Sequence, residues 1–116
     1  MFKTLKELKT YAETMEQTKV YHVGPSHANH QRAVYQIGQI QILIDTVFPH
    51  NFFKPSQEWY WTGHYMSQTQ AEKFAKKYNA RIEDAYYSDY DEKQLMFDNL
   101  DDLLHWIWDN RKEELN

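Results

Sequence analysis

Residues 33–48 constrain the fold more than any other segment, because they decide whether the middle of the chain is helical or extended. A helix is compatible with the spacing of Val34, Ile37, Ile40, Ile44 and Val47. The same segment also carries Ile40, Ile42 and Ile44 at every second position, which is the period of a strand. Since β-branched side chains and a central Gly38 favour a hairpin, we predict two strands here.

Two reciprocal capping patterns predict helices on either side of this segment. Thr4 is followed by Glu7, and Ser67 by Gln70, so that each pair can satisfy two free N–H groups of a first helical turn. We expect the first helix over about residues 4–17 and the second from Ser67 onward. Their predicted buried faces are Leu5, Leu8, Ala12 and Met15 in the first, and Ala71, Phe74, Ala75 and Tyr78 in the second.

A third helix is predicted after Asn99, which can cap its first turn. Its buried face is expected to hold Leu100, Leu103, Leu104, Ile107 and Trp108. Trp106 falls off this stripe and is therefore expected at the surface. Asn79 suits the left-handed position that ends the second helix.

Four other segments are predicted to be strands: residues 19–23, 58–66, 81–87 and 92–97. Residues 58–66 are rich in aromatic and β-branched side chains. Residues 88–91 have the composition of a turn between the last two. With no long linker, residues 1–116 are expected to form a single α+β domain. We predict a mainly antiparallel sheet with an N-terminal helix and two further helices packed on one of its faces.

Composition limits the classes of protein to which the chain can belong. Hydrophobic residues make up 41% and aromatic residues 16%, which is enough for one core. With no cysteine there is no disulfide, thiolate nucleophile or zinc knuckle. The N-terminal segment lacks the apolar core of a signal peptide, so we expect a cytoplasmic protein without a membrane partner. The net charge of −4 disfavours direct binding to nucleic acid.

Negative charge is concentrated between residues 83 and 102, where eight acids face the single base Lys93 and the net charge is −7. The acids proposed to form a binding surface are Glu83, Asp84, Asp89, Asp91, Asp98, Asp101 and Asp102. Carboxylates held together in this way would attract a protein with a basic surface. The ordinary interpretation is that some of them stabilise a helix start and others make a turn.

Aromatic residues of the segment 58–65 are the second candidate for a binding surface. Trp59 and Trp61 share one face of the predicted strand, and Tyr60 lies on the other. A core strand has the same pattern as an exposed aromatic patch, so both interpretations stay open. Together with Trp106, these residues could bind a partner or close a homodimer.

Histidines provide the competing, catalytic interpretation. His22, His27 and His30 have the spacing of metal ligands, although solvated histidines in a polar loop are the more common case. His64 could act with Glu58 and Ser67 in hydrolysis, but no nucleophile motif or phosphate-binding loop accompanies them. We therefore predict no metal site and no cofactor.

These patterns together favour a small, acidic, non-catalytic interaction module, such as an accessory or inhibitor protein of a bacterium or its phage. Its expected partner is a protein with a basic surface. A metal-dependent or hydrolytic enzyme built on the histidines and a homodimeric structural protein are the two alternatives.

Overall fold

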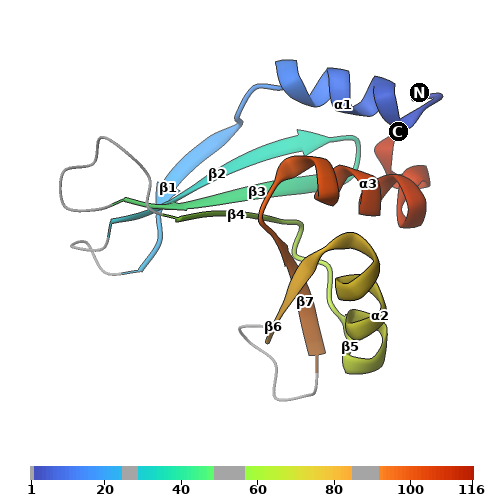
Figure 1. Cartoon of the computed structure of the whole chain (residues 1–116). Coiled ribbons are helices and arrows are strands. Elements are labelled where there is room, and N and C mark those ends of the chain that lie inside the picture. Colours follow the sequence, from blue (N-terminus) through green and yellow to red (C-terminus); the bar gives the residue numbers. More distant parts are fainter. Residues whose placement is uncertain (1, 25–28, 49–56, 85–91) are drawn as a thin grey trace.

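The structure is a computed structural model that describes residues 2–24, 29–48, 57–84 and 92–116. These residues form helices and strands in mixed order (Figure 1). The helices are α1 (Leu5–Thr14), α2 (Gln68–Tyr78), α3 (Leu100–Asn110) and the short 3₁₀ helix η1 (Lys112–Leu115). The strands are β1 (Lys19–His22), β2 (His30–Ile37), β3 (Ile40–Val47), β4 (Gln57–Trp61), β5 (Met66–Ser67), β6 (Ala80–Asp84) and β7 (Glu92–Phe97).

All seven strands belong to one antiparallel sheet, in which β1, β2, β3 and β4 follow one another and β7 comes next. β6 pairs with residues 93–97 along one edge of β7. β4 and β5 must therefore share the other edge, at opposite ends of β7. The predicted α+β fold with a mainly antiparallel sheet is confirmed.

The hairpin predicted over residues 33–48 is present as β2 and β3, so the helical interpretation is wrong. Ile37 pairs with Ile40 across a turn in which Gly38 has a φ of +57°, a conformation that other residues rarely adopt. The turn also packs tightly against η1. A Cβ atom on Gly38 would lie 2.4 Å from the carbonyl carbon of Leu115, so this position has no room for a side chain.

The helices begin where the capping residues predict. The Thr4 hydroxyl accepts a hydrogen bond from the Glu7 N–H, and the Asn99 side chain accepts one from the Asp102 N–H. Ser67 caps α2 in the same way, through the N–H of Gln70. α1 ends at Thr14, earlier than expected, because the backbone of the next residue is already extended.

The ends of the other elements also follow local backbone chemistry. Asn79 ends α2 in the predicted left-handed conformation, with a φ of 56°. The single strand expected over residues 58–66 is a wrong prediction, because β4 stops at Trp61 and β5 starts at Met66. Gly63 lies between them with a φ of +72°, which interrupts the extended backbone.

The core lies between the helices and one face of the sheet. Its central residues are Ile37, Ile40, Ile42, Leu95 and Phe97 of the sheet, and Leu8, Ala71, Leu103, Leu104 and Ile107 of the helices. α3 contacts both α1 and α2 as well as β4 and β7. The prediction that the helices pack on one face of the sheet is therefore confirmed.

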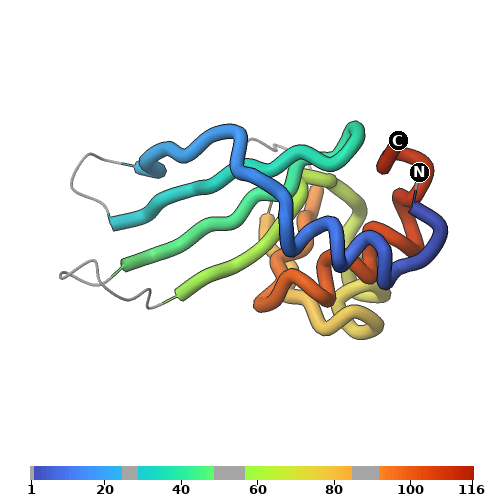
Figure 2. The backbone as a smooth tube through the Cα atoms, turned by 90° about the horizontal axis from the view of Figure 1, so that it is seen from above, coloured from blue at the N-terminus to red at the C-terminus, as the bar shows by residue number. Residues whose placement is uncertain are grey.

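The sheet extends further than the helices that cover it. Viewed from above, the far ends of β2, β3 and β4 project beyond them (Figure 2). The radius of gyration is 14.7 Å, compared with about 13 Å for a compact domain of this length. Among the helices that the structure describes, none is long and apolar enough to cross a membrane.

Candidate functional site

The sheet has a second face, which points away from the helix-covered core. Because side chains alternate along each strand, the strand registers place on this face Lys19, Tyr21, His30, Arg32, Val34, Leu43, Asp45, Gln57, Trp59, Trp61, Arg81, Glu83, Gln94 and Met96. None of these residues belongs to the main core cluster. The second face thus combines charged, aromatic and apolar side chains outside that core.

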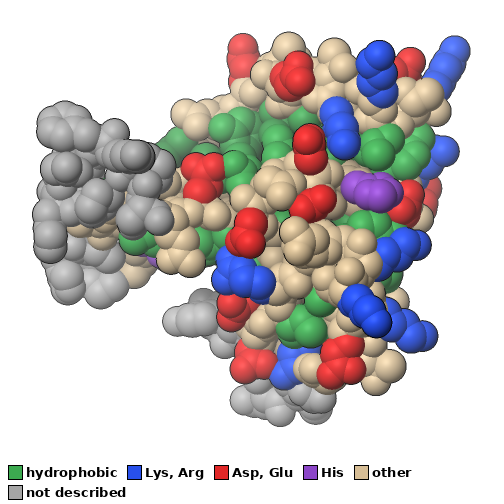
Figure 3. All heavy atoms as spheres, in the orientation of Figure 1, with side chains coloured by type: hydrophobic (Ala, Val, Ile, Leu, Met, Phe, Trp, Pro, Cys, Tyr) green, Lys and Arg blue, Asp and Glu red, His purple; other side chains and the backbone are tan. Residues whose placement is uncertain are grey.

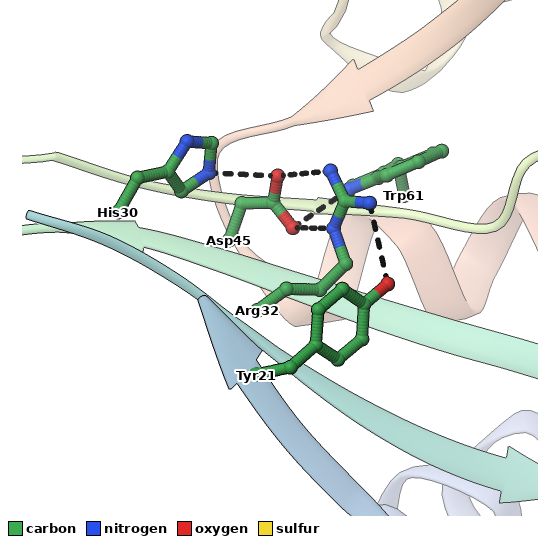
Figure 4. A network of polar contacts seen from close by, with 5 residues as sticks. All are labelled: Tyr21, His30, Arg32, Asp45 and Trp61. Carbon is green, nitrogen blue, oxygen red and sulfur yellow. Dashed lines mark hydrogen bonds and ion pairs between the residues drawn. The ribbon is translucent and has the colours of Figure 1, made fainter. Parts of the chain in front are cut away.

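A buried carboxylate occupies the middle of the second face. Asp45 is only 1% exposed. Arg32 donates to both of its oxygens, from Nε to Oδ1 at 2.7 Å and from Nη2 to Oδ2 at 2.9 Å. His30 Nε2 lies 3.0 Å from Oδ2, and the Trp61 indole N–H donates to Oδ1 at 3.2 Å (Figure 4). Each carboxylate oxygen therefore has two partners, which offsets the desolvation of the charge.

Arg32 is held from its other sides by two aromatic rings. Its guanidinium carbon lies 4.7 Å from the centre of the Trp61 ring and 5.8 Å from that of Tyr21. Nη1 also donates to the Tyr21 hydroxyl at 3.4 Å. The hydrogen bonds to Asp45 raise the pKa of Arg32, so the guanidinium stays charged. We call Tyr21, His30, Arg32, Asp45 and Trp61 the Asp45 cluster. Its contacts join four neighbouring strands, which is a structural role.

Next to this cluster lies a hollow of about 230 Å³, lined by Gln57, Trp59, Arg81, Glu83 and Met96. We call it the Trp59 hollow. Among the described residues, β4 and β7 pair only at Tyr60 and Phe97, and β7 crosses the direction of β4 steeply (Figure 1). The two strands consequently splay apart beside the hollow, which side chains of β4, β6 and β7 line.

Two carboxylates share one cation at the edge of the Trp59 hollow: Glu83, which lines the hollow, and Asp98, which is joined to it through Arg81. We call these two carboxylates the rim. Arg81 Nη1 lies 3.6 Å from Glu83 Oε1, and Arg81 Nε lies 3.3 Å from Asp98 Oδ1. The three side chains are 43%, 48% and 67% exposed, respectively. Extension of the β4–β7 register places Asp98 opposite Trp59. The hollow therefore combines an aromatic wall with a rim of net negative charge.

The other acidic residues of the predicted binding surface lie in different parts of the molecule. Asp84 forms an ion pair with Lys93 on the helix-covered face of β6. Asp101 and Asp102 lie in the first turn of α3, where the side-chain amide of Asn99 donates to Asp102 at 2.9 Å. Several acidic side chains gather near the start of α3 and over β6, with a basic group among them (Figure 3). The predicted acidic surface is thus partly neutralised, and its members Asp89 and Asp91 lie outside the described residues.

Trp106 must be removed from the predicted binding surface. It is 2% exposed, and its ring meets Phe74 edge-on at 5.7 Å. Trp59 and Trp61, by contrast, are partly exposed and lie on the second face as a pair. Of the three tryptophans proposed for binding, Trp59 lines the hollow, and Trp61 is engaged with Asp45.

Two of the histidines proposed as metal ligands, His22 and His30, are described by the structure, and they are not brought together. His22 pairs with Gln31, so it projects from the face opposite to that of His30. His27 lies outside the described residues. Within the part of the chain that the structure describes, no three His, Asp or Glu side chains are grouped as a metal site would need.

The residues proposed for hydrolysis have separate partners. The His64 ring packs on Trp106 at 5.4 Å, and its pKa is lowered by burial and by the charge of Arg111. Glu58 accepts a hydrogen bond from the Tyr60 hydroxyl. Ser67 is occupied as the cap of α2. No hydrogen bond among the described residues joins His64, Glu58 and Ser67.

The sequence interpretation missed the Asp45 cluster, although a signal was present. Asp45 is a lone acid in the apolar run of β3, and Arg32 lies in β2. Once the turn is fixed by the pairing of Ile37 with Ile40, the antiparallel register places Arg32 directly opposite Asp45. A buried ion pair would then have been the natural prediction.

Comparisons of the chain with protein-family models, with curated proteins and with solved structures found no match. Function is therefore inferred from the geometry of the second face. That face has two parts, a filled Asp45 cluster and an open Trp59 hollow, which touch where the His30 ring packs on Trp59 with ring centres 5.1 Å apart.

Proposed function

We propose that this domain is a non-catalytic protein-interaction module that binds a partner with a basic surface around the Trp59 hollow. The observation that carries the proposal is the meeting of an aromatic wall with two exposed carboxylates, Glu83 and Asp98, at one hollow. Protein interfaces commonly combine an aromatic centre with a charged rim. Here, Trp59 comes from β4 and Glu83 from β6, the two strands that flank β7, and Asp98 directly follows β7.

The net negative charge around the Trp59 hollow favours a partner with a basic surface. Arg81 can balance only one of the two rim carboxylates. Asp101 and Asp102 add two negative charges at the nearby start of α3. A local excess of one sign increases the rate at which an oppositely charged protein associates and helps to orient it. The partner should therefore present lysine or arginine side chains.

The proposed setting is the cytoplasm of a bacterium or its phage, with an accessory or inhibitor role. An inhibitor of this kind would cover a basic surface on its target. Salt should weaken the complex, because the carboxylates of the rim are exposed and their attraction is screened.

Affinity capture from a native lysate of the source organism tests the proposal with two variants of equal charge change. We expect Glu83→Gln combined with Asp98→Asn to lose a partner that the unmodified domain retains. Glu13→Gln combined with Glu72→Gln, on α1 and α2, should retain it. Retention of every partner by the first variant would contradict the proposal. Light scattering on the same samples identifies self-association, the homodimer alternative.

A further inference from the structure

The Asp45 cluster shows how this sheet face recognises a guanidinium. Arg32 lies over the Trp61 ring and binds the Asp45 carboxylate through two nitrogens. A planar guanidinium that lies over an aromatic ring can still donate hydrogen bonds from its own edge, so both properties of arginine are used at once. The cluster is therefore a filled arginine site within the domain itself.

The Trp59 hollow repeats the same chemistry two residues earlier on β4. Trp59 and Trp61 project from the same side of this strand. Trp59 and Met96 supply apolar walls, and Glu83 and Asp98 supply carboxylates at the rim. The volume of about 230 Å³ is several times the roughly 30 Å³ that one water molecule occupies in the liquid. A side chain of a partner can therefore enter.

Arg81 already places a guanidinium between the two rim carboxylates. Its contacts of 3.6 Å to Glu83 and 3.3 Å to Asp98 are longer than those of a strong charge-assisted hydrogen bond. The three side chains are also well exposed, which makes these pairs weak. The position of Arg81 thus shows that a guanidinium can lie between the two carboxylates. Because its contacts are weak, another guanidinium can replace it there.

We infer that the Trp59 hollow is a seat for an arginine side chain of the partner. The stem of this arginine lies against Trp59 and Met96, and its guanidinium takes the place of Arg81 between Glu83 and Asp98. The inference rests on the proposed function and specifies the partner: a protein that presents an arginine from an exposed segment. Lysine is a poorer occupant, because its compact and strongly hydrated ammonium has no planar face to stack on a ring and no fork of donors.

The test uses a blocked peptide with one arginine between glycines, and its lysine counterpart, titrated into the whole domain. Binding is followed by nuclear magnetic resonance of the tryptophan indole N–H groups, with Trp59 assigned through Trp59→Phe. We expect the Trp59 signal to shift and the arginine peptide to bind about threefold more tightly than the lysine peptide. Absence of a Trp59 shift, or equal affinity for both peptides, would overturn the inference.

Variants separate competition from simple contact. Arg81→Met keeps an apolar stem and frees both carboxylates, so the arginine peptide should bind about threefold more tightly. Glu83→Gln combined with Asp98→Asn should weaken it about tenfold. Asp84→Asn, which lies on the other face, should leave it unchanged. Weaker binding by Arg81→Met would show that Arg81 is itself a contact and would refute the displacement.

Failure of the arginine seat can be distinguished from failure of the proposed function. If the rim variant loses its captured partner but the two peptides bind alike, the interaction module stands and the arginine seat fails. If the rim variant still captures every partner, the proposed function fails, regardless of how tightly the peptides bind.

Discussion

The Asp45 cluster and the Trp59 hollow contain similar residues but differ in how closely those residues are held. In the cluster, arginine and carboxylate meet at 2.7 Å and 2.9 Å, and the carboxylate is buried. In the hollow, the corresponding distances are 3.3 Å and 3.6 Å between exposed groups. β2, β3 and β4 pair residue by residue beneath the cluster, whereas β4 and β7 splay apart at the hollow. Continuous strand pairing holds the side chains of the Asp45 cluster tightly together. Interrupted pairing leaves the side chains of the Trp59 hollow accessible.

The largest difference between the two regions should appear in stability. Asp45→Asn leaves Arg32 partly buried without a counter-charge, and we expect a loss of about 3 kcal/mol in the free energy of unfolding. The rim variant, Glu83→Gln with Asp98→Asn, should change it by less than about 0.5 kcal/mol. Urea denaturation measures both. Equal losses in the free energy of unfolding would contradict the difference between the tightly held Asp45 cluster and the accessible Trp59 hollow.

An intermediate effect is expected at Gln94, on the second face beside Met96. Gln94 is 7% exposed, and its Oε1 has no hydrogen-bond partner among the residues that the structure describes. Replacing it with methionine removes a desolvated acceptor at similar volume and should raise the free energy of unfolding by about 1 kcal/mol. Gln57→Met, at an exposed position of the hollow, is the matched control and should have almost no effect. A lower free energy of unfolding for Gln94→Met would mean that the side-chain amide of Gln94 forms hydrogen bonds in the folded protein.

The smallest effect concerns pH and a residue outside both regions. The pKa of His64 is lowered in the folded state by burial and by Arg111. Between that lowered value and the ordinary value near 6.5, the unfolded chain binds more protons, so stability rises with pH and is lost as pH falls. Because His64 keeps contact with solvent on one side, the effect should be small. His64→Gln should flatten the pH dependence of the melting temperature, and an unchanged slope would assign it to another group.

Much of the fold could be predicted because its signals are local. The capping residues Thr4, Ser67 and Asn99 set the helix starts, and Gly38 with its β-branched neighbours set the hairpin. Trp106 was mispredicted because α3 packs against two helices and the sheet together. A helix enclosed on several sides buries more than one stripe, so the spacing of a single face underestimates its core.

The candidate site could be predicted only in part. Trp59, Glu83 and Asp98 belong to the surface that aromatic and charge patterns indicated. Their convergence depends on β4 meeting β7, two strands that are distant in the sequence, and on their splay. Arg32 and Asp45 needed the register of the hairpin as well. Pairing between distant strands is set by the whole core, which no short segment encodes.

The packing of η1 on the β2–β3 turn has a consequence for folding during synthesis. The Gln39 N–H donates to the Glu114 carbonyl at 2.7 Å, and Leu115 is buried beside Gly38. These partners lie some 75 residues apart along the chain. On a ribosome, the early hairpin would emerge long before the segment that covers its turn. Contacts of such long range slow folding, so the nascent domain should reach its native state only after η1 has left the exit tunnel.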